Sequence, residues 1–134
     1  MKRTNLIFVV SLLLSSLLTG CGGGKQPSTK LNVTFTDYQF NPNSFIVPAG
    51  KEVTLTAVNN GTVTHEFVIM KFGTKVGKDF GHADEANIYW EMEVDAGGSA
   101  TATFTAPSEP GEYQVVCGIA GHYMAGMVAT LVVK

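Results

Sequence analysis

The stretch that decides the fold class lies at residues 52–61 and reads Glu52-Val53-Thr54-Leu55-Thr56-Ala57-Val58-Asn59-Asn60-Gly61. Its apolar side chains Val53, Leu55 and Ala57 alternate with polar ones, which is the period of a strand that buries one face. The stretch ends at 59–61, a sequence typical of a tight turn. A half-buried strand that stops at a tight turn predicts a β-sheet.

Short apolar stretches recur on both sides of this strand. At 31–36, for example, Leu31, Val33 and Phe35 alternate with polar residues. We expect about eight short strands separated by turns, at 31–36, 45–47, 52–57, 65–70, 89–94, 100–104, 113–116 and 128–133. This pattern predicts an all-β fold, an antiparallel β-sandwich.

Residues 71–88 break the pattern of strands. They contain three glycines and three lysines, and residues 84–87 could form one helical turn. We assign no role to this region from the sequence.

Length and composition favour one folded domain. The chain has 134 residues, of which 45 % are hydrophobic and 15 % charged, so it can bury a core. Its formal net charge is −2 and its only arginine is Arg3, so nucleic acid is not an expected partner. The two cysteines exclude a fold held together by several disulfides.

The N-terminal segment has the features of a bacterial export signal. Lys2 and Arg3 precede an apolar stretch at 6–18, which is too short and too often interrupted by serine to predict a membrane-spanning helix. Leu18-Thr19-Gly20-Cys21 follows and resembles the lipobox of bacterial lipoproteins. An uncleaved anchor helix and an ordinary signal peptide are the alternatives.

These features predict three parts of the chain. We expect residues 1–20 to be a lipoprotein signal peptide and Cys21 to carry the lipid, whose several acyl chains form a stable anchor. Residues 21–30 are small and polar, which is typical of a flexible tether. The folded domain is then 31–134.

Residue types that bind metals gather near the C-terminus. Cys117, His122 and Met127 recur every five residues between the last two predicted strands. His65 begins an earlier strand, and a sandwich gathers its loops at two ends, where His65 can meet this loop. Two imidazoles, a thiolate and a weakly bound thioether form the donor set of blue-copper electron-transfer sites. The four residues therefore predict a site for one copper ion.

On these residues the chain resembles the cupredoxins, a family of small blue copper proteins. The spacing C-x4-H-x4-M at 117–127 is similar to that of the auracyanin branch. The residues at 47–53 and 59–61, ahead of His65, resemble the family's approach to its first ligand. The resemblance covers 31–134, which we expect to be one cupredoxin domain.

The resemblance implies a Greek-key β-sandwich that holds one type 1 copper ion. It implies His65, Cys117 and His122 as strong ligands and Met127 as the weak axial ligand. Met124 is the alternative axial ligand, but its spacing after His122 fits the family less well.

Two residues depart from the usual cupredoxin pattern. Glu66 follows the first ligand, where the family often has Asn, and Gly118 follows the cysteine, where it often has Ser or Thr. Both departures remove side chains that brace the site, and such outer contacts tune a metal centre. The reduction potential is therefore not predicted.

Other chemistries fit the sequence less well. A structural zinc site takes four strong N or S ligands, and a thioether is not one of them. Catalysis by Cys117 with His122 as base needs an exposed thiol of low pKa, whereas the valines at 115–116 predict a buried thiol, so we do not expect an enzyme. His82 with the acids at 84–85 could form a second metal site or a docking feature, and we favour a solvated loop.

The sequence thus predicts a membrane-anchored, single-copper electron-transfer protein that cycles between Cu(II) and Cu(I) outside the cytoplasm. The resemblance implies that electrons pass through the exposed edge of His122. The expected apolar docking face around it consists of Gly118, Ile119, Ala120, Tyr123, Met124 and Ala125.

We expect a monomer, lipid-anchored on the periplasmic or cell-surface side of a bacterial membrane. Its expected partner is a redox protein such as a cytochrome or a terminal oxidase. The alternative function is an extracytoplasmic copper carrier or storage lipoprotein without an electron-shuttle role.

Overall fold

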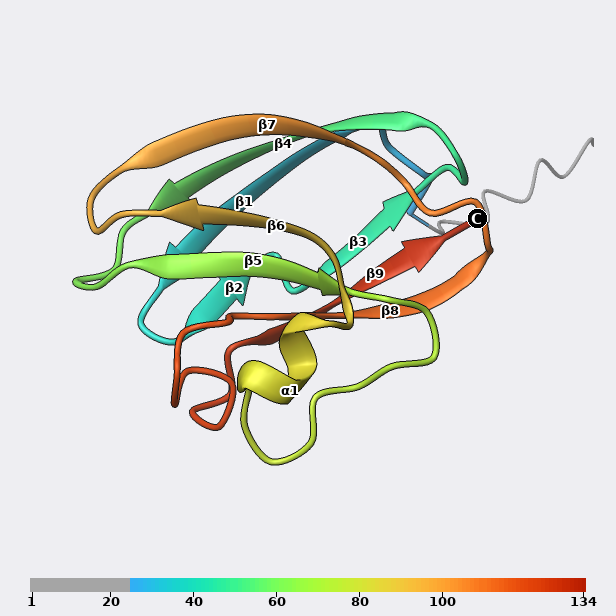
Figure 1. Ribbon diagram of the computed structural model, residues 1–134. Helices are drawn as coiled ribbons and strands as arrows, with labels where there is room; N and C mark the ends of the chain where they lie inside the picture. Colours follow the sequence, from blue (N-terminus) through green and yellow to red (C-terminus); the bar gives the residue numbers. More distant parts are fainter. Residues whose placement is uncertain (1–24) are drawn as a thin grey trace, which may run out of the picture.

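Two β-sheets pack face to face in the computed structural model, which describes residues 25–134 (Figure 1). The first sheet has the strand order β2-β1-β4-β7, and the second has the order β3-β9-β8-β5-β6. The elements are β1 (Lys30–Thr36), β2 (Gln39–Asn41), β3 (Ser44–Val47), β4 (Glu52–Asn59), β5 (His65–Met70), α1 (His82–Glu85), β6 (Ile88–Val94), β7 (Ser99–Thr105), β8 (Gly111–Val116) and β9 (Val128–Val133). The predicted lipoprotein signal at 1–20 and the predicted lipid attachment at Cys21 lie outside the described residues.

The alternation in the predicted strands is an alternation of burial in the structure. In β4, Val53, Leu55 and Ala57 are fully buried, and the threonines between them are only half-buried. All eight predicted strands are present, and the expected β-sandwich is confirmed. β2 is an additional strand that the sequence did not predict, because its one apolar residue, Phe40, stands between polar residues and forms no apolar run.

Both sheets are mixed, a detail that the expected antiparallel pairing did not include. β1 pairs with β4 in parallel and β3 pairs with β9 in parallel, whereas the other neighbours are antiparallel. In both parallel pairs the chain crosses to the other sheet between the two partners. Such long crossovers are what parallel neighbours require.

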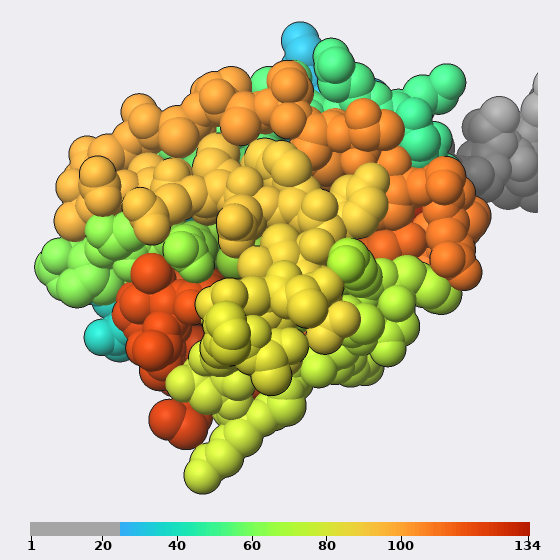
Figure 2. All heavy atoms as spheres, viewed as in Figure 1, coloured from blue at the N-terminus to red at the C-terminus, as the bar shows by residue number. Residues whose placement is uncertain are grey.

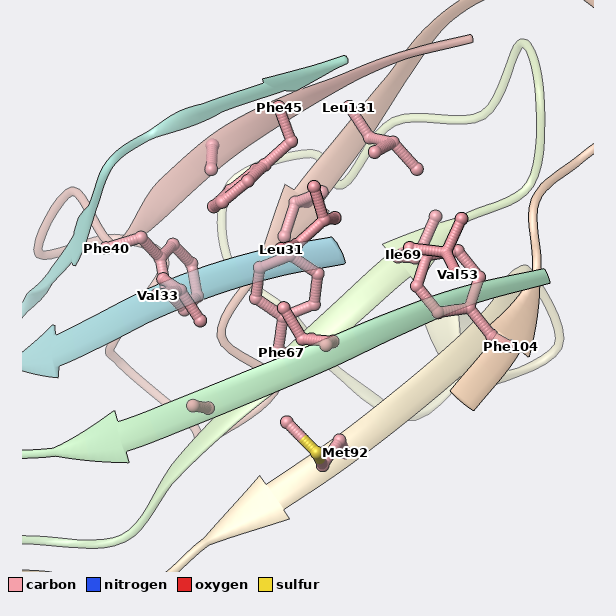
Figure 3. Packing of buried hydrophobic residues seen from close by; sticks show 14 of the residues in the cluster. Leu31, Val33, Phe40, Phe45, Val53, Phe67, Ile69, Met92, Phe104 and Leu131 are labelled. Carbon is pink, nitrogen blue, oxygen red and sulfur yellow. The ribbon is translucent and has the colours of Figure 1, made fainter. Parts of the chain in front are cut away.

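Aromatic rings fill the space between the sheets (Figure 3). The ring centroid of the buried Phe67 on β5 lies 5.5 Å from those of both Phe40 and Phe45, and 6.4 Å from that of Phe35. Phe67 follows His65 by two residues, so the two side chains lie on the same face of β5. The core therefore fixes the strand that carries the predicted first ligand.

Residues 71–88, whose structure the sequence left open, are mostly irregular. α1 is a single helical turn, and it begins two residues earlier than the turn that the sequence allowed at 84–87. No helix within residues 25–134 has the length and apolar character that crossing a membrane requires.

A second apolar cluster lies on the outer face of the second sheet and consists of Val68, Met70, Val76 and Val116. Val76 belongs to residues 71–88 and is buried in this cluster, so these residues cover part of the outer face of the second sheet.

Candidate metal centre

Strand pairing brings the predicted ligands to one end of the sandwich. His65 is the first residue of β5, and Cys117 directly follows the last residue of β8. These strands are antiparallel neighbours with Val68 opposite Val116, so the beginning of β5 lies beside the end of β8. Residues 117–127, here called the ligand loop, connect β8 to β9 at this end and contain His122 (Figure 1).

The donor atoms of three predicted ligands converge. The Nδ1 atoms of His65 and His122 are 3.1 Å apart, and the Sγ atom of Cys117 lies 3.3 Å from Nδ1 of His122 and 3.9 Å from Nδ1 of His65. The point equidistant from the three atoms lies about 2.0 Å from each, close to the distance of about 2.0–2.3 Å at which nitrogen and thiolate ligands bind zinc. The triangle therefore fits one metal ion of that size. Within residues 25–134, no other group of three or more His, Cys, Asp or Glu donors comes within metal-binding reach.

All three donors are buried. His65 and Cys117 are completely inaccessible, and His122 is 8 % exposed. Burial raises the pKa of the Cys117 thiol, and burial together with the neighbouring His65 lowers the pKa of His122. A lowered pKa favours the neutral imidazole of His122, the form that binds metals, and a cation at the centre would offset the cost of burying a thiolate.

The two candidate axial methionines differ in exposure. Met127 is completely buried, its N–H donates to the carbonyl of His122 at 3.0 Å, and its carbonyl accepts from the N–H of Cys117 at 3.1 Å. Met124 is 60 % exposed. A ligand to a buried ion must be buried with it, so these positions favour Met127, and its axial role stays a prediction.

Asp37 contacts the predicted ligand His65, and the sequence did not reveal this contact. Its carboxylate lies 2.8 Å from Nε2 of His65, and it also accepts hydrogen bonds from the N–H of Thr62 at 3.0 Å and the hydroxyl of Thr62 at 2.7 Å. The bonds from Thr62, followed by the bond from His65, hold the pKa of Asp37 at about 2, so it is ionised. A His65 ring that donates from Nε2 keeps Nδ1 free of a proton and directed at the other donors.

The turn before β5 leaves room for the side chains of Asp37 and His65. Asn59 is completely buried; its amide donates to the carbonyls of Val63 and Val94 at 2.9 Å each, and its Oδ1 accepts from the N–H of Gly61 at 2.8 Å. A Cβ atom at Gly61 would overlap the Asp37 carboxylate and crowd the His65 ring. The Asn-Asn-Gly stretch, predicted as a turn, therefore also leaves room for the predicted first ligand, His65, and for Asp37 beside it.

Glu66 and Gly118 lie against each other beside Cys117. The N–H of Glu66 donates to Sγ of Cys117 at 3.3 Å, so the backbone supplies one contact to the sulfur. A Cβ atom at Gly118 would overlap the end of the Glu66 side chain, so a larger residue at 118 would require that carboxylate to move. Burial, followed by the charges of Glu91 and Glu93, raises the pKa of Glu66.

The surface over His122 is partly aromatic. The ring of Tyr38 packs edge-on against His122 with centroids 4.7 Å apart, and Tyr38 is 40 % exposed. In the predicted docking face, Ala120, Met124 and Ala125 are exposed, and the remaining members are partly buried. Tyr38 is an addition to this face that no pattern in the sequence indicated.

His82 lies apart from the site. Its side chain is 96 % exposed and contacts the carboxylate of Glu85 at 3.0 Å, while Asp84 accepts a hydrogen bond from the N–H of Gly81. This arrangement supports the favoured interpretation of a solvated loop.

Fold and donors together define a class of protein: a β-sandwich with one buried site for a single transition-metal ion, made from two imidazoles and a thiolate. The chain belongs to the family described as the cupredoxin-like domain, whose model matches residues 5–133. The resemblance seen in the sequence is therefore confirmed at the level of the family.

Similar proteins include auracyanins. Auracyanin-B of Chloroflexus aurantiacus is 32 % identical over 110 residues, which are 70 % of this chain and 46 % of that protein, so the chain spans about half the length of this relative. The copper-resistant cuproprotein CopI of Rubrivivax gelatinosus is 28 % identical over 122 residues, 84 % of this chain and 71 % of CopI. The crystal structure of dithionite-reduced auracyanin from Roseiflexus castenholzii matches with a TM-score of 0.69 and 31 % identity, over 81 % of this chain and 99 % of that one.

Proposed function

We propose that the chain is a single-copper electron-transfer protein, in which His65, Cys117 and His122 hold the ion and Met127 is the weak axial ligand. The observation that carries the proposal is the buried triangle of two imidazole nitrogens and one sulfur, with its centre at metal-bonding distance from all three. Membership of the cupredoxin-like family and similarity to auracyanins support one type 1 copper ion as the cofactor. Copper, when bound, supplies a one-electron step between Cu(II) and Cu(I).

The protein's own contribution is to hold the donors still. Asp37 fixes the ring of His65, the N–H of Glu66 contacts the sulfur of Cys117, and hydrogen bonds of the loop backbone fix His122 on both sides. Donors fixed in this way change position little when the charge of the ion changes. Burial keeps water from the site, which favours electron exchange over ligand exchange.

Electrons then enter and leave near His122, the one donor with measurable exposure. The apolar surface around it suits brief contact with a redox protein such as a cytochrome or terminal oxidase. We propose no enzymatic activity, because a buried Cys117 thiol with a raised pKa is a poor nucleophile. The proposed site of action is outside the cytoplasm, with a monomer tethered to a bacterial membrane by lipid on Cys21.

Titration of the purified protein with Cu(II) tests the proposal. We expect an intense visible band from the thiolate–copper bond at one ion per chain, bleached by reductant and restored by oxidant. Cys117→Ser is the matched control and should give no such band. A wild-type protein that stays colourless with Cu(II) contradicts the proposal.

A copper carrier is the second candidate function, and the similarity to the copper-resistant cuproprotein CopI favours it. A carrier should bind Cu(I) tightly and release it to an acceptor protein or chelator on a physiological time scale. Reversible oxidation and reduction without loss of copper supports the electron-transfer function instead.

A further inference from the structure

The segment 71–81, between β5 and α1, packs along the ligand loop. Figure 2 shows these yellow-green residues against the red residues of the loop on one face of the molecule. Val76 anchors the segment because it is buried in the second apolar cluster, which Tyr123 of the ligand loop also contacts. The segment is thus fixed to the sheet on one side and touches the loop on the other.

The first contact with the loop lies just before His122. Oδ2 of Asp79 accepts a hydrogen bond from the N–H of Gly121 at 2.8 Å. Gly121 has φ of +84°, a conformation that other residues adopt rarely, so the chain turns sharply at this point. The other oxygen of Asp79 is buried and has no hydrogen-bond partner within residues 25–134. In the part of the chain that the structure describes, the bond to Gly121 is therefore the one hydrogen bond that the Asp79 carboxylate makes.

The second contact lies just after His122. The hydroxyl of Tyr123 donates to the carbonyl of Val76 at 3.3 Å and accepts from the amide of Gln114 at 3.2 Å. Gln114 in turn accepts from the N–H of Val76 at 2.8 Å. The three residues therefore form a closed set of hydrogen bonds that joins the segment, β8 and the ligand loop.

We infer that the segment 71–81 is a brace that sets the position of His122. Asp79 holds Gly121, and Val76 holds Tyr123 of the ligand loop together with Gln114 of β8. Both chain neighbours of His122 are held by the segment, so the ring cannot shift along the loop without breaking one of two independent contacts. Partners that orient metal ligands are worth about 10- to 100-fold in metal affinity. The role in copper binding rests on the proposed function, whereas the holding of Gly121 and Tyr123 does not.

Copper binding tests the brace in the loaded protein. We expect Asp79→Ala to weaken Cu(II) affinity by about 10- to 100-fold and to change the visible and electron paramagnetic resonance spectra. Asp79→Asn keeps an acceptor oxygen and should restore most of both properties. Tyr123→Phe, which removes only the hydroxyl, should change the spectra in a protein that still folds.

Thr74→Val is the matched control. Thr74 lies in the same segment, but its hydroxyl donates to the carbonyl of Lys71 at 2.7 Å rather than to the ligand loop. The control should match the wild-type protein in affinity and spectra. Equal affinity and equal spectra in Asp79→Ala and Thr74→Val overturn the inference.

Hydrogen exchange of the metal-free protein separates the brace from the copper proposal. The amide of Gly121 should exchange about tenfold or more faster in Asp79→Ala than in the wild type, and near the wild-type rate in Asp79→Asn and Thr74→Val. Absence of a copper band in the wild type refutes the proposed function and leaves this readout intact. Unchanged exchange at Gly121 in Asp79→Ala overturns the brace whatever the protein binds.

Discussion

Asp37 places a negative charge behind the ring of His65, on the side away from the other donors. Its carboxylate is 2.8 Å from Nε2, while Nδ1 faces Cys117. Because this charge stabilises Cu(II) more than Cu(I), we predict that Asp37→Asn raises the reduction potential and leaves the protein blue. Voltammetry of the copper-loaded variant measures the shift.

Asp95→Asn is the control for this prediction. The carboxylate of Asp95 accepts from the hydroxyl of Thr64 at 3.1 Å, so this variant removes the same charge from a neighbouring place without freeing a predicted ligand. If Asp37→Asn and Asp95→Asn shift the reduction potential by the same amount, a specific role for Asp37 is contradicted.

The two methionines of the ligand loop offer a second matched pair. Met127 is buried and Met124 is 60 % exposed. We predict that Met127→Leu keeps copper but shifts the potential, because a weak axial ligand tunes the site more than it holds the ion, and that Met124→Leu changes neither. Copper stoichiometry and potential measure both variants, and the reverse result would reassign the axial ligand to Met124.

The convergence of His65, Cys117 and His122 could be predicted because two of them share one loop with a recognisable spacing. Asp37 could not be predicted, since a single acid after a strand forms no local pattern. It reaches His65 only because β1 pairs with β4, with Phe35 opposite Asn59, which places the end of β1 beside the turn at Gly61. Contacts of this kind depend on register, which the sequence does not display.

At the scale of elements, β8 leads into the ligand loop and carries a buried phenol. Burial raises the pKa of Tyr113, and the charges of Glu109 and Tyr89 raise it further. A group whose pKa is higher in the folded than in the unfolded protein stabilises the fold below its unfolded value, about 10, and this contribution is lost as the pH rises through the folded pKa. We therefore predict that the free energy of unfolding falls above about pH 10.

Denaturant unfolding of the wild type and Tyr113→Phe between about pH 8 and pH 11 measures this effect. The variant cannot ionise at this position, so its unfolding free energy should fall less steeply. Parallel curves for the two proteins would refute the assignment to Tyr113.

The strands with alternating side chains were predictable because alternation directly reports which face is buried. It does not report neighbours, so the parallel pairs β1–β4 and β3–β9 were not foreseen. The segment 71–81 showed no period at all, since its role depends on one buried valine and a few polar contacts to a distant loop. The sequence therefore specified layers and strands more fully than it specified connections.

At the scale of the whole molecule, the predicted lipid on Cys21 would keep the domain beside a membrane. We predict that Cys21→Ser moves the protein from the membrane fraction to the soluble fraction, because a stable anchor requires the acyl chains. Fractionation of the producing cells, with mass spectrometry of the N-terminal peptide, measures this. Cys117→Ser is the control and should remain in the membrane fraction. A Cys21→Ser protein that also remains in the membrane fraction would contradict lipid anchoring at Cys21.

Anomalous diffraction at the copper absorption edge, from crystals of the copper-loaded protein, tests the central claim most directly. The buried donors of His65, Cys117 and His122 should surround a single peak, about 2 Å from each of the three atoms. A peak elsewhere, for example beside His82 and Glu85, or a peak that lacks the Cys117 sulfur as a neighbour, would contradict the proposed site.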